Sequence, residues 1–331
     1  MKKRFFYTNI ISIIFIMTFV CIFNYILDPY GVFKNDFSRQ VLEANKNYIK
    51  TKYILNNPNK YDSFLFGSSK VGAIENELIP NGKYYNMTYS EGLPKDWLNN
   101  IKTFLNNDIK IKNIFIALDD FSFTCDPNDH LIQPMRIPYE NLNKFKLFST
   151  YLFRNPFDLY NTKTIKGLLT DTYDGSNFDL YSTGRGFTTF TEEKEKLESL
   201  TEKELNSSIY DSPTIFFDYN RVNETLSEIE EIIDICNKSN INLNIIFNPI
   251  HKTTYLSINK EILNEAKDKL SELTSFWDFT DLNEVSENNY YWAETTHYRL
   301  IVGRMILEKV FSIDLGVNTP DDFGSFINRK D

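Results

Sequence analysis

The chain begins with a long apolar segment. Its uncharged run extends from Phe5 to Leu27 and follows a basic cluster, Lys2-Lys3-Arg4. At about 1.5 Å per residue this run would measure roughly 34 Å as a helix, which is enough to cross the hydrocarbon core of a bilayer. Because the basic cluster lies before the run, the positive-inside rule predicts a cytoplasmic N-terminus and an extracellular position for the rest of the chain.

A cleaved signal peptide and a buried core helix are the alternatives to a membrane anchor. A signal peptide has a short apolar core and small residues at its cleavage site, whereas this run is long and ends in bulky residues. Val20, before Cys21, is too large for a lipoprotein cleavage site. The length and the basic start argue against a core helix. We therefore expect an uncleaved single-pass anchor in the cell membrane over residues 1–30, followed by an extracytoplasmic domain over 31–331.

Beyond the anchor, short apolar segments alternate with amphipathic ones. The predicted strands are Ser63–Phe66, Lys83–Met87, Lys112–Leu118, Asn242–Asn248 and Phe276–Phe279. The predicted helices span 38–57, 71–79, 94–107, 221–239, 257–273 and 299–311. Alternation of strands with helices is typical of parallel pairing, with helices on both faces of the sheet. The pattern therefore predicts an α/β fold with a parallel sheet of about five strands in the order 2-1-3-4-5.

One long region lacks this alternation. From about residue 120 to residue 220 the chain is rich in aromatic and polar residues and shows no regular succession of strands and helices. A structureless loop of this length is not expected inside a compact domain. We interpret the region as an insertion, with some helix around 144–169, that forms a cap over one end of the sheet.

Composition and charge narrow the classes of function. The net charge of −9 gives no electrostatic support for binding nucleic acid. The three cysteines include no CxxC pair, so we expect neither a metal site nor a disulfide framework. A single bond between Cys125 and Cys236 stays open as an alternative. Nothing in the composition calls for a cofactor.

The first predicted strand ends in a polar turn, Gly67-Ser68-Ser69-Lys70. Two interpretations compete for this turn. One is an ordinary strand-to-helix connection in which a serine caps the next helix. The other is a nucleophile placed at the carboxyl end of a strand, where open α/β folds hold their ligands. We expect Lys70 itself to be solvated in the first turn of the following helix.

A serine nucleophile needs a base, and the chain has only three histidines. His297 follows Glu294 by three residues, a spacing that lets a carboxylate hold Nδ1 and leaves Nε2 to face a hydroxyl. A surface capping pair is the alternative for this motif. His251 lies after a predicted strand, where it either lines the same site or is a turn histidine following Pro249. We expect His130, in a polar loop, to be solvated.

Taken together, Gly67-Ser68-Ser69 and Glu294-x-x-His297 resemble the first and last sequence blocks of the SGNH (GDSL-like) hydrolase superfamily. The resemblance implies a flavodoxin-like sheet with Ser69 as nucleophile, His297 as base and Glu294 as the residue that orients the imidazole. Gly92 best matches the second-block glycine, whose N–H helps to bind the oxyanion.

The match has two departures. Glutamate stands where aspartate is usual in the last block, and the third block, G-x-N-D, is absent. Asp119-Asp120 follows the third predicted strand instead, so no asparagine supplies a second oxyanion donor and the carboxylates would repel an oxyanion. Asp119 and His251 are therefore kept, with Gly92, as candidate residues of the oxyanion and substrate site.

These departures and the anchor point to the membrane-anchored branch of the superfamily. The chain resembles the DltD proteins of teichoic-acid D-alanylation and the anchored SGNH-type O-acetyltransferases of cell-surface polysaccharides. The resemblance implies an extracytoplasmic acyltransferase with a serine acyl-enzyme. It implies a multipass membrane-bound O-acyltransferase as acyl donor and a polysaccharide or teichoic acid as acceptor. An esterase of the same architecture and a non-catalytic surface binding or scaffolding protein remain as alternatives.

Overall fold

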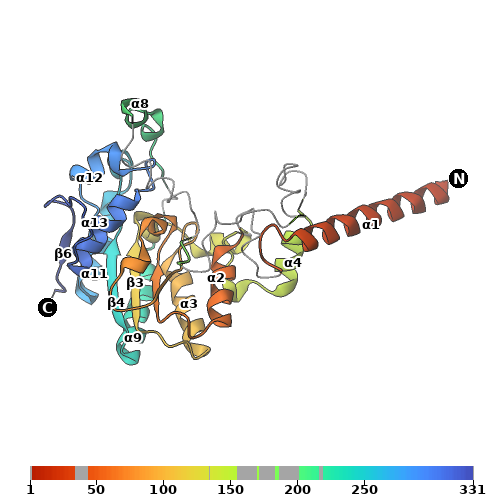
Figure 1. Cartoon of the computed structure of the whole chain (residues 1–331), viewed down its shortest axis with the longest axis horizontal. Helices are drawn as coiled ribbons and strands as arrows, with labels where there is room; N and C mark the ends of the chain where they lie inside the picture. Colours follow the sequence, from red (N-terminus) through yellow and green to blue (C-terminus); the bar gives the residue numbers. More distant parts are fainter. Residues whose placement is uncertain are drawn as a thin grey trace.

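A six-stranded sheet forms the centre of the domain in the computed structural model (Figure 1). The structure describes residues 2–33, 44–133, 135–154, 170, 183–185, 201–215 and 219–330. The strands are β1 (Ser63–Phe66), β2 (Tyr84–Asn86), β3 (Asn113–Leu118), β4 (Asn242–Phe247), β5 (Phe276–Asp278) and β6 (Ser325–Ile327). Their order is β2-β1-β3-β4-β5-β6, and all pairs are parallel except β5 with β6. The predicted order of the five parallel strands is confirmed.

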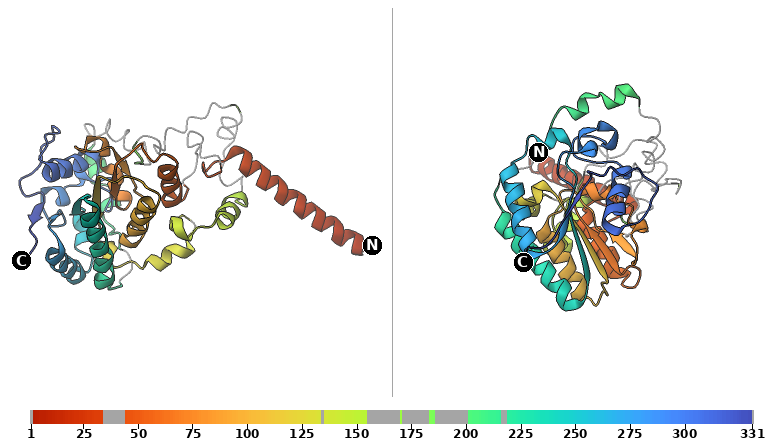
Figure 2. Two further views of the ribbon diagram at one scale, coloured as in Figure 1. Left: turned by 90° about the horizontal axis from the view of Figure 1, so that it is seen from below. Right: turned by 90° about the vertical axis from the view of Figure 1, so that its left-hand side faces the viewer.

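Helices cover both faces of this sheet (Figure 2, right). The described α-helices are α1 (Lys2–Leu27), α2 (Lys46–Asn56), α3 (Pro94–Asn106), α4 (Lys144–Leu152), α8 (Glu202–Leu205), α9 (Val222–Ser239), α10 (Lys252–Tyr255), α11 (Lys260–Leu273), α12 (Glu284–Glu287) and α13 (Leu300–Phe311). The described 3-10 helices are η2 (Ser69–Ala73), η3 (Asn76–Leu78), η4 (Asp120–Phe123), η5 (Pro127–Ile132), η6 (Tyr139–Asn141), η7 (Ser208–Tyr210) and η8 (Asn289–Tyr291).

Side-chain alternation along the strands builds one core on each face. In β3, Ile114 and Ile116 join the core made with α3, α9 and α11, whereas Phe115 and Ala117 join the core made with α13. Every residue of β3 is buried, because the strand has a parallel neighbour on each side and helices above and below. This burial explains why the strand could be recognised as a continuous apolar run.

Two local predictions are wrong. The helix expected over 71–79 is replaced by the short 3-10 helices η2 and η3. Gly72 has a low helix propensity, and Ile74 takes an extended conformation, with ψ 117°, that ends η2. The antiparallel edge strand β6 was not predicted, because its three residues are largely exposed and form no buried apolar run.

The N-terminal helix α1 projects away from the domain (Figures 1 and 2). Among the described residues it is the one helix long and apolar enough to cross a membrane, with a span over Lys3–Leu27. Only 11% of its most apolar window is buried against the rest of the protein. The predicted apolar span, Phe5–Leu27, therefore lies within a single exposed helix.

The described parts of the region from 120 to 220 lie in several places; residues 183–185, for example, lie beside β2, where the Asn86 N–H donates to the Thr183 carbonyl at 2.8 Å. Residues 201–215 pack on the loop before α13, where the hydroxyl of Tyr210 donates to the Trp292 carbonyl at 2.9 Å and that of Thr295 to the Ser212 carbonyl at 2.8 Å. Helix α4 lies instead beside the end of α1 (Figure 1). The helix predicted around 144–169 is present as α4 up to Leu152, and residues 155–169 lie outside the described residues.

Candidate active site

The turn after β1 gives its two serines different surroundings. Ser68 is buried, and its Oγ accepts the N–H of Lys70 at 3.3 Å, so it caps η2. Ser69 is the first residue of η2 and is partly exposed. A Cβ at Gly67 would lie 2.5 Å from a methyl group of Val71, so the close packing of this turn requires a glycine. Both sequence interpretations therefore describe part of the turn, with Ser68 as the cap and Ser69 as the presented hydroxyl.

Ser69, His297 and Glu294 form a continuous hydrogen-bonded chain. Ser69 Oγ lies 2.7 Å from His297 Nε2, although the two residues are 228 positions apart. The other ring nitrogen, Nδ1, contacts Glu294 Oε1. The serine comes from the carboxyl end of β1 and the histidine from the loop that leads into α13. The fold thus brings together the three residues that the sequence predicted to meet.

Backbone contacts fix the carboxylate in this loop. Glu294 Oε2 accepts the N–H of Thr296 at 2.8 Å, and Oε1 accepts the N–H of His297 at 2.8 Å. Burial raises the pKa of Glu294, but the hydrogen bond and charge of His297 and the two backbone N–H groups outweigh burial, so the pKa lies below its ordinary value. Glu294 is therefore ionised at neutral pH.

An ionised Glu294 determines which nitrogen of His297 carries the proton. A carboxylate can only accept hydrogen bonds, so Nδ1 must be the protonated nitrogen of the neutral imidazole. The lone pair of Nε2 is then directed at the Ser69 hydroxyl, which donates to it. This is the arrangement in which an imidazole removes a proton from a serine.

Lys70 is not solvated, contrary to the prediction. Its side chain is only 3% exposed, and Nζ lies 3.0 Å from Asp119 Oδ1 and 3.6 Å from Asp120 Oδ1. Burial disfavours the ammonium form, but the charges of the two aspartates outweigh it and raise the pKa of Lys70 above its ordinary value. Lys70, the residue after the candidate nucleophile, is therefore a buried cation. Its burial is possible because two carboxylates at the end of β3 pair with its charge.

This ion pair continues into a buried network behind the candidate site. Asp119 Oδ1 also accepts the Asn248 side-chain amide at 3.1 Å, and Asn248 Oδ1 accepts the hydroxyl of Tyr298 at 3.0 Å. Lys70 follows Ser69 in the chain, and Tyr298 follows His297. The network therefore joins the two loops that carry Ser69 and His297. Sequence reasoning missed Lys70, Asn248 and Tyr298 in this role. The one available signal was the position of Asn248 at the carboxyl end of a strand.

Gly92 packs directly against the turn of Ser69. A Cβ at Gly92 would lie 2.5 Å from the Gly67 carbonyl oxygen, so only a glycine allows this approach. Its N–H, the predicted oxyanion donor, donates to the Tyr89 carbonyl at 3.3 Å. That distance is at the long end of the range for N–H···O bonds, so the bond is a weak one.

His251 lies at the carboxyl edge of the sheet, as predicted, but both of its ring nitrogens have partners outside the Ser69 chain. Nδ1 accepts the N–H of Thr253 at 3.2 Å, and Nε2 lies 3.0 Å from Asn289 Oδ1. Burial lowers the pKa of His251, which favours the neutral ring. The ring also stacks on Tyr210 and meets the edge of Trp292. His251 thus supports the loop that carries Glu294 and does not touch Ser69.

His130 is buried, and the prediction of a solvated side chain is wrong. Its Nδ1 lies 3.0 Å from Asp96 Oδ2, which also accepts the Tyr89 hydroxyl at 2.6 Å. The polar sequence around His130 gave no sign of this burial, because Asp96 and Tyr89 come from the segment around α3. The cluster lies apart from the Ser69 chain and stabilises the turn that leads from Tyr89 to Gly92.

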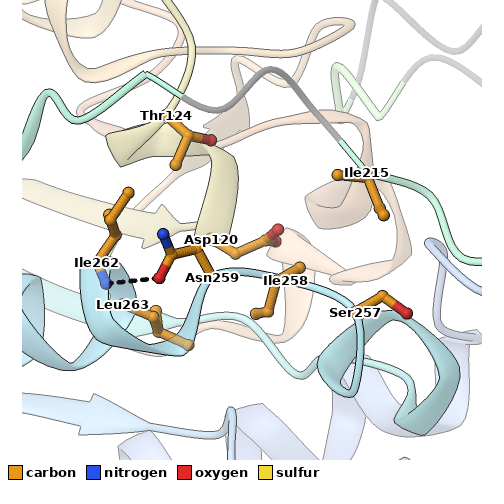
Figure 3. Close-up of a pocket in the computed structure, with 8 residues that line it drawn as sticks. All are labelled: Asp120, Thr124, Ile215, Ser257, Ile258, Asn259, Ile262 and Leu263. Carbon is orange, nitrogen blue, oxygen red and sulfur yellow. Dashed lines mark hydrogen bonds between the residues drawn. The ribbon is translucent and has the colours of Figure 1, made fainter.

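A cavity of about 210 Å³ opens beside Asp120 (Figure 3). It is lined by Asp120, Thr124, Ile215, Ser257, Ile258, Asn259, Ile262 and Leu263. Burial raises the pKa of Asp120, and the charge of Lys70 opposes this rise. The cavity therefore adjoins the ion pair that lies behind Ser69. Within the described ranges, no cluster of three or more His, Cys, Asp or Glu side chains could hold a metal ion.

No protein-family model matches the chain, and no curated protein is significantly similar to it in sequence. The functional argument therefore depends on the geometry of the chain's own residues. The strongest geometric observation is the hydrogen-bonded chain from Ser69 through His297 to Glu294.

Proposed function

We propose that the protein is an extracytoplasmic serine-dependent acyltransferase that modifies a cell-surface polymer. The observation that carries the proposal is the 2.7 Å contact between Ser69 Oγ and His297 Nε2, with Glu294 on the far side of the ring. The resemblance of these motifs to the SGNH superfamily agrees with this assignment. Acetyl and D-alanyl groups are the two acyl classes that the resemblance suggests.

In the first half of the reaction, Ser69 Oγ attacks the carbonyl carbon of the acyl donor and gives its proton to His297 Nε2. The resulting tetrahedral intermediate collapses and expels the donor's leaving group, which takes the proton from Nε2. An ester between Ser69 and the acyl group remains. Glu294 keeps the ring in position and stabilises the imidazolium while it carries the proton.

In the second half, a hydroxyl of the polymer attacks the Ser69 ester and gives its proton to Nε2 of His297. The second tetrahedral intermediate collapses to the polymer ester, and Ser69 Oγ recovers the proton. Water attacking the same ester would instead make the protein a hydrolase, so the chemistry of the acyl-enzyme does not separate a transferase from an esterase.

Charge near Ser69 determines how well an oxyanion is tolerated. Two carboxylates at the end of β3 would disfavour the intermediate if they were unpaired. Lys70 offsets part of this negative charge through its contacts with Asp119 and Asp120. An oxyanion is also a stronger acceptor than the Tyr89 carbonyl for the weakly bonded N–H of Gly92. Gly92 thus remains the candidate oxyanion donor.

The exposed apolar helix α1 favours transfer at a membrane surface over hydrolysis of a soluble ester. In the proposed arrangement α1 crosses the cell membrane once and the domain lies outside. A multipass membrane-bound O-acyltransferase delivers the acyl group to Ser69, and a polysaccharide or teichoic acid accepts it. Acyl transfer of this kind needs the site to stay close to the membrane that delivers its donor.

Labelling of the full-length protein in membranes with a fluorophosphonate probe tests the nucleophile. We expect the wild type to react, Ser69→Ala and His297→Ala to be unlabelled, and Ser68→Ala to react because Ser68 only caps the turn. Absence of labelling in a folded wild type would favour the non-catalytic surface protein. Labelling of Ser69→Ala but not of Ser68→Ala would move the nucleophile by one residue.

A further inference from the structure

Helix α4 and the segment before it carry large apolar side chains that are unusually exposed to solvent. Outside α1, the two most exposed large apolar side chains among the described residues are Phe145, at 83%, and Ile132, at 82%. Phe148 and Phe153 are exposed as well. We call Ile132, Phe145, Phe148 and Phe153 the α4 surface. Single exposed apolar residues are common in proteins, but a group on one short segment marks an interaction surface.

The opposite face of α4 is anchored in the protein. Leu147 and Tyr151 are buried in a small core with Tyr48 and Ile49. Because Leu147 and Tyr151 are four positions apart, they share one face of the helix. Phe145 falls on the opposite face, and Phe148 lies at the edge between the two, where it is 40% exposed. The Tyr151 hydroxyl also accepts the N–H of Asn45 at 2.9 Å. The aromatic side chains of the α4 surface therefore cannot turn inward without breaking this core.

The carboxyl end of α4 is joined to the end of α1. The side-chain amide of Asn24, in the last turns of α1, donates to the carbonyls of Leu152 and Arg154, both at 2.8 Å. The ring of Phe33 lies 5.5 Å from that of Tyr25 and 5.4 Å from that of Phe148. Figure 1 shows α4 beside the end of α1 that meets the domain. The α4 surface is therefore located where the apolar helix leaves the domain.

Basic residues accompany the α4 surface. Lys144, Lys146 and Arg154 are exposed on α4 or directly after it, in a chain whose net charge is −9. Lys146 Nζ also donates to the Leu131 carbonyl at 3.3 Å, which ties α4 to the segment of Ile132. Exposed aromatic residues interleaved with lysines are typical of helices that lie in the interface of a bilayer with anionic headgroups.

We propose that the α4 surface lies in the headgroup region of the same bilayer that α1 crosses. This inference rests on the proposed membrane anchoring of α1, and goes beyond it. A helix alone would leave the domain free to tilt on its anchor, whereas a second lipid contact beside the first restricts that motion. The domain is then held with one defined side toward the membrane.

Lipid-phase quenching in proteoliposomes of the full chain tests the proposal. A nitrobenzoxadiazole fluorophore is attached at Phe145→Cys in vesicles of phosphatidylethanolamine and phosphatidylglycerol that contain spin-labelled lipid. The half-buried native thiol of Cys21 is removed by Cys21→Ala, and the thiols of Cys125 and Cys236 are buried and so protected from labelling. Matched probes are placed at Phe15→Cys in α1 and at Phe326→Cys in β6. The Phe326 side chain is 50% exposed, and strand β6 lies at the opposite end of the molecule from α1 (Figure 1).

We expect the probes at positions 15 and 145 to be quenched several-fold more strongly than the probe at position 326. Quenching at 15 without quenching at 145 would overturn the inference and leave the anchor intact. Absence of quenching at both positions would overturn the anchoring and the inference together. Equal quenching at 145 and 326 would mean that the domain adheres to lipid non-specifically, and would also overturn the proposal.

The same vesicles separate a lipid surface from a protein partner. No other protein is present in them, so a surface built to contact a membrane protein alone would leave the probe at position 145 unquenched. With Lys144→Glu and Lys146→Glu together, we expect quenching at 145 to fall in vesicles with phosphatidylglycerol and to be the same as in the parent chain in vesicles without it. Unchanged quenching at position 145 in anionic vesicles after these two substitutions would refute the electrostatic part of the proposal.

Discussion

Lys70 Nζ lies 3.0 Å from Asp119 Oδ1 in the buried space directly behind Ser69. The ammonium group offsets part of the charge of two carboxylates that would otherwise face the site of the proposed oxyanion. Through Asn248 and Tyr298 the same pair supports the loop of His297. The ion pair is thus expected to stabilise the two loops that carry Ser69 and His297, and mutation tests this structural role.

Replacing Lys70 by methionine should destabilise the domain strongly. Removal of one partner of a buried ion pair typically lowers the free energy of unfolding by about 3–5 kcal/mol, because the remaining charge is left unpaired. Adding Asp119→Asn and Asp120→Asn to Lys70→Met should recover a large part of this loss. Urea unfolding of the purified proteins measures both effects.

The matched control is Lys252→Met. Lys252 pairs with Glu287 at 2.8 Å, but both side chains are 48% exposed. This change should therefore lower the free energy of unfolding by at most about 1 kcal/mol. Equal losses of stability for Lys70→Met and Lys252→Met would contradict the view that the Lys70 pair matters because it is buried.

The acid sensitivity of the site should depend on Glu294. Its pKa in the folded protein lies below the ordinary value of 4.5, so its contribution to stability is present above that value and is lost as the pH falls through the lowered pKa. The difference in the free energy of unfolding between wild type and Glu294→Gln should therefore shrink as the pH is lowered below 4.5. Unfolding curves of the two proteins recorded from neutral to acid pH measure this difference in the free energy of unfolding. A difference that grows toward acid pH would contradict the lowered pKa of Glu294.

Glu294→Gln should also slow the reaction of Ser69 without abolishing it. An amide can donate to Nδ1 and so stabilise the wrong tautomer of His297, an effect that reduces turnover by up to about 10⁴-fold in serine triads. The rate of fluorophosphonate labelling reports this loss. An unchanged rate in the variant would remove Glu294 from the proposed site.

Gly92→Ala should displace the turn that carries Ser69, although the two residues are far apart in the sequence. The new Cβ would lie 2.5 Å from the Gly67 carbonyl oxygen, a backbone atom, so the turn that carries Ser69 must shift. We expect labelling to slow at least tenfold while the protein stays folded. Gly316→Ala is the control for backbone strain away from the site. Its φ of +73° disfavours alanine, although a Cβ there meets nothing within 4 Å, so this variant should lose stability but keep full labelling. Full labelling of Gly92→Ala would separate Gly92 from the site.

The sequence predicted the parts of the structure that depend on strong local patterns. The apolar runs located all five parallel strands, and β1 was placed at Ser63–Phe66, as observed. The meeting of Ser69 with His297 was expected from the resemblance of their two motifs to a known family. It agreed with their positions after the first strand and before the last helix, because the carboxyl ends of parallel strands share one edge. The spacing of Glu294 and His297 accounted for the third contact.

The features that sequence reasoning missed depend on partners distant in the chain. Lys70 and His130 look like surface residues, and they are buried only because Asp119, Asp120 and Asp96 meet them in the fold. Asn248 could be recognised as a polar residue directly after the β4 run, but nothing in the sequence indicated that its side chain would bridge Asp119 and Tyr298. Tertiary contacts of this kind leave no periodicity in the sequence.

The acyl-ester content of the surface polymer in cells that carry Ser69→Ala tests the central claim most directly. At protein levels matched to wild type, we predict that Ser69→Ala and His297→Ala each reduce the content to that of cells lacking the protein. The double variant should be no worse than either, because the two residues act as one unit. Normal acylation in cells with Ser69→Ala would contradict the account, and increased acylation would contradict it in favour of an esterase.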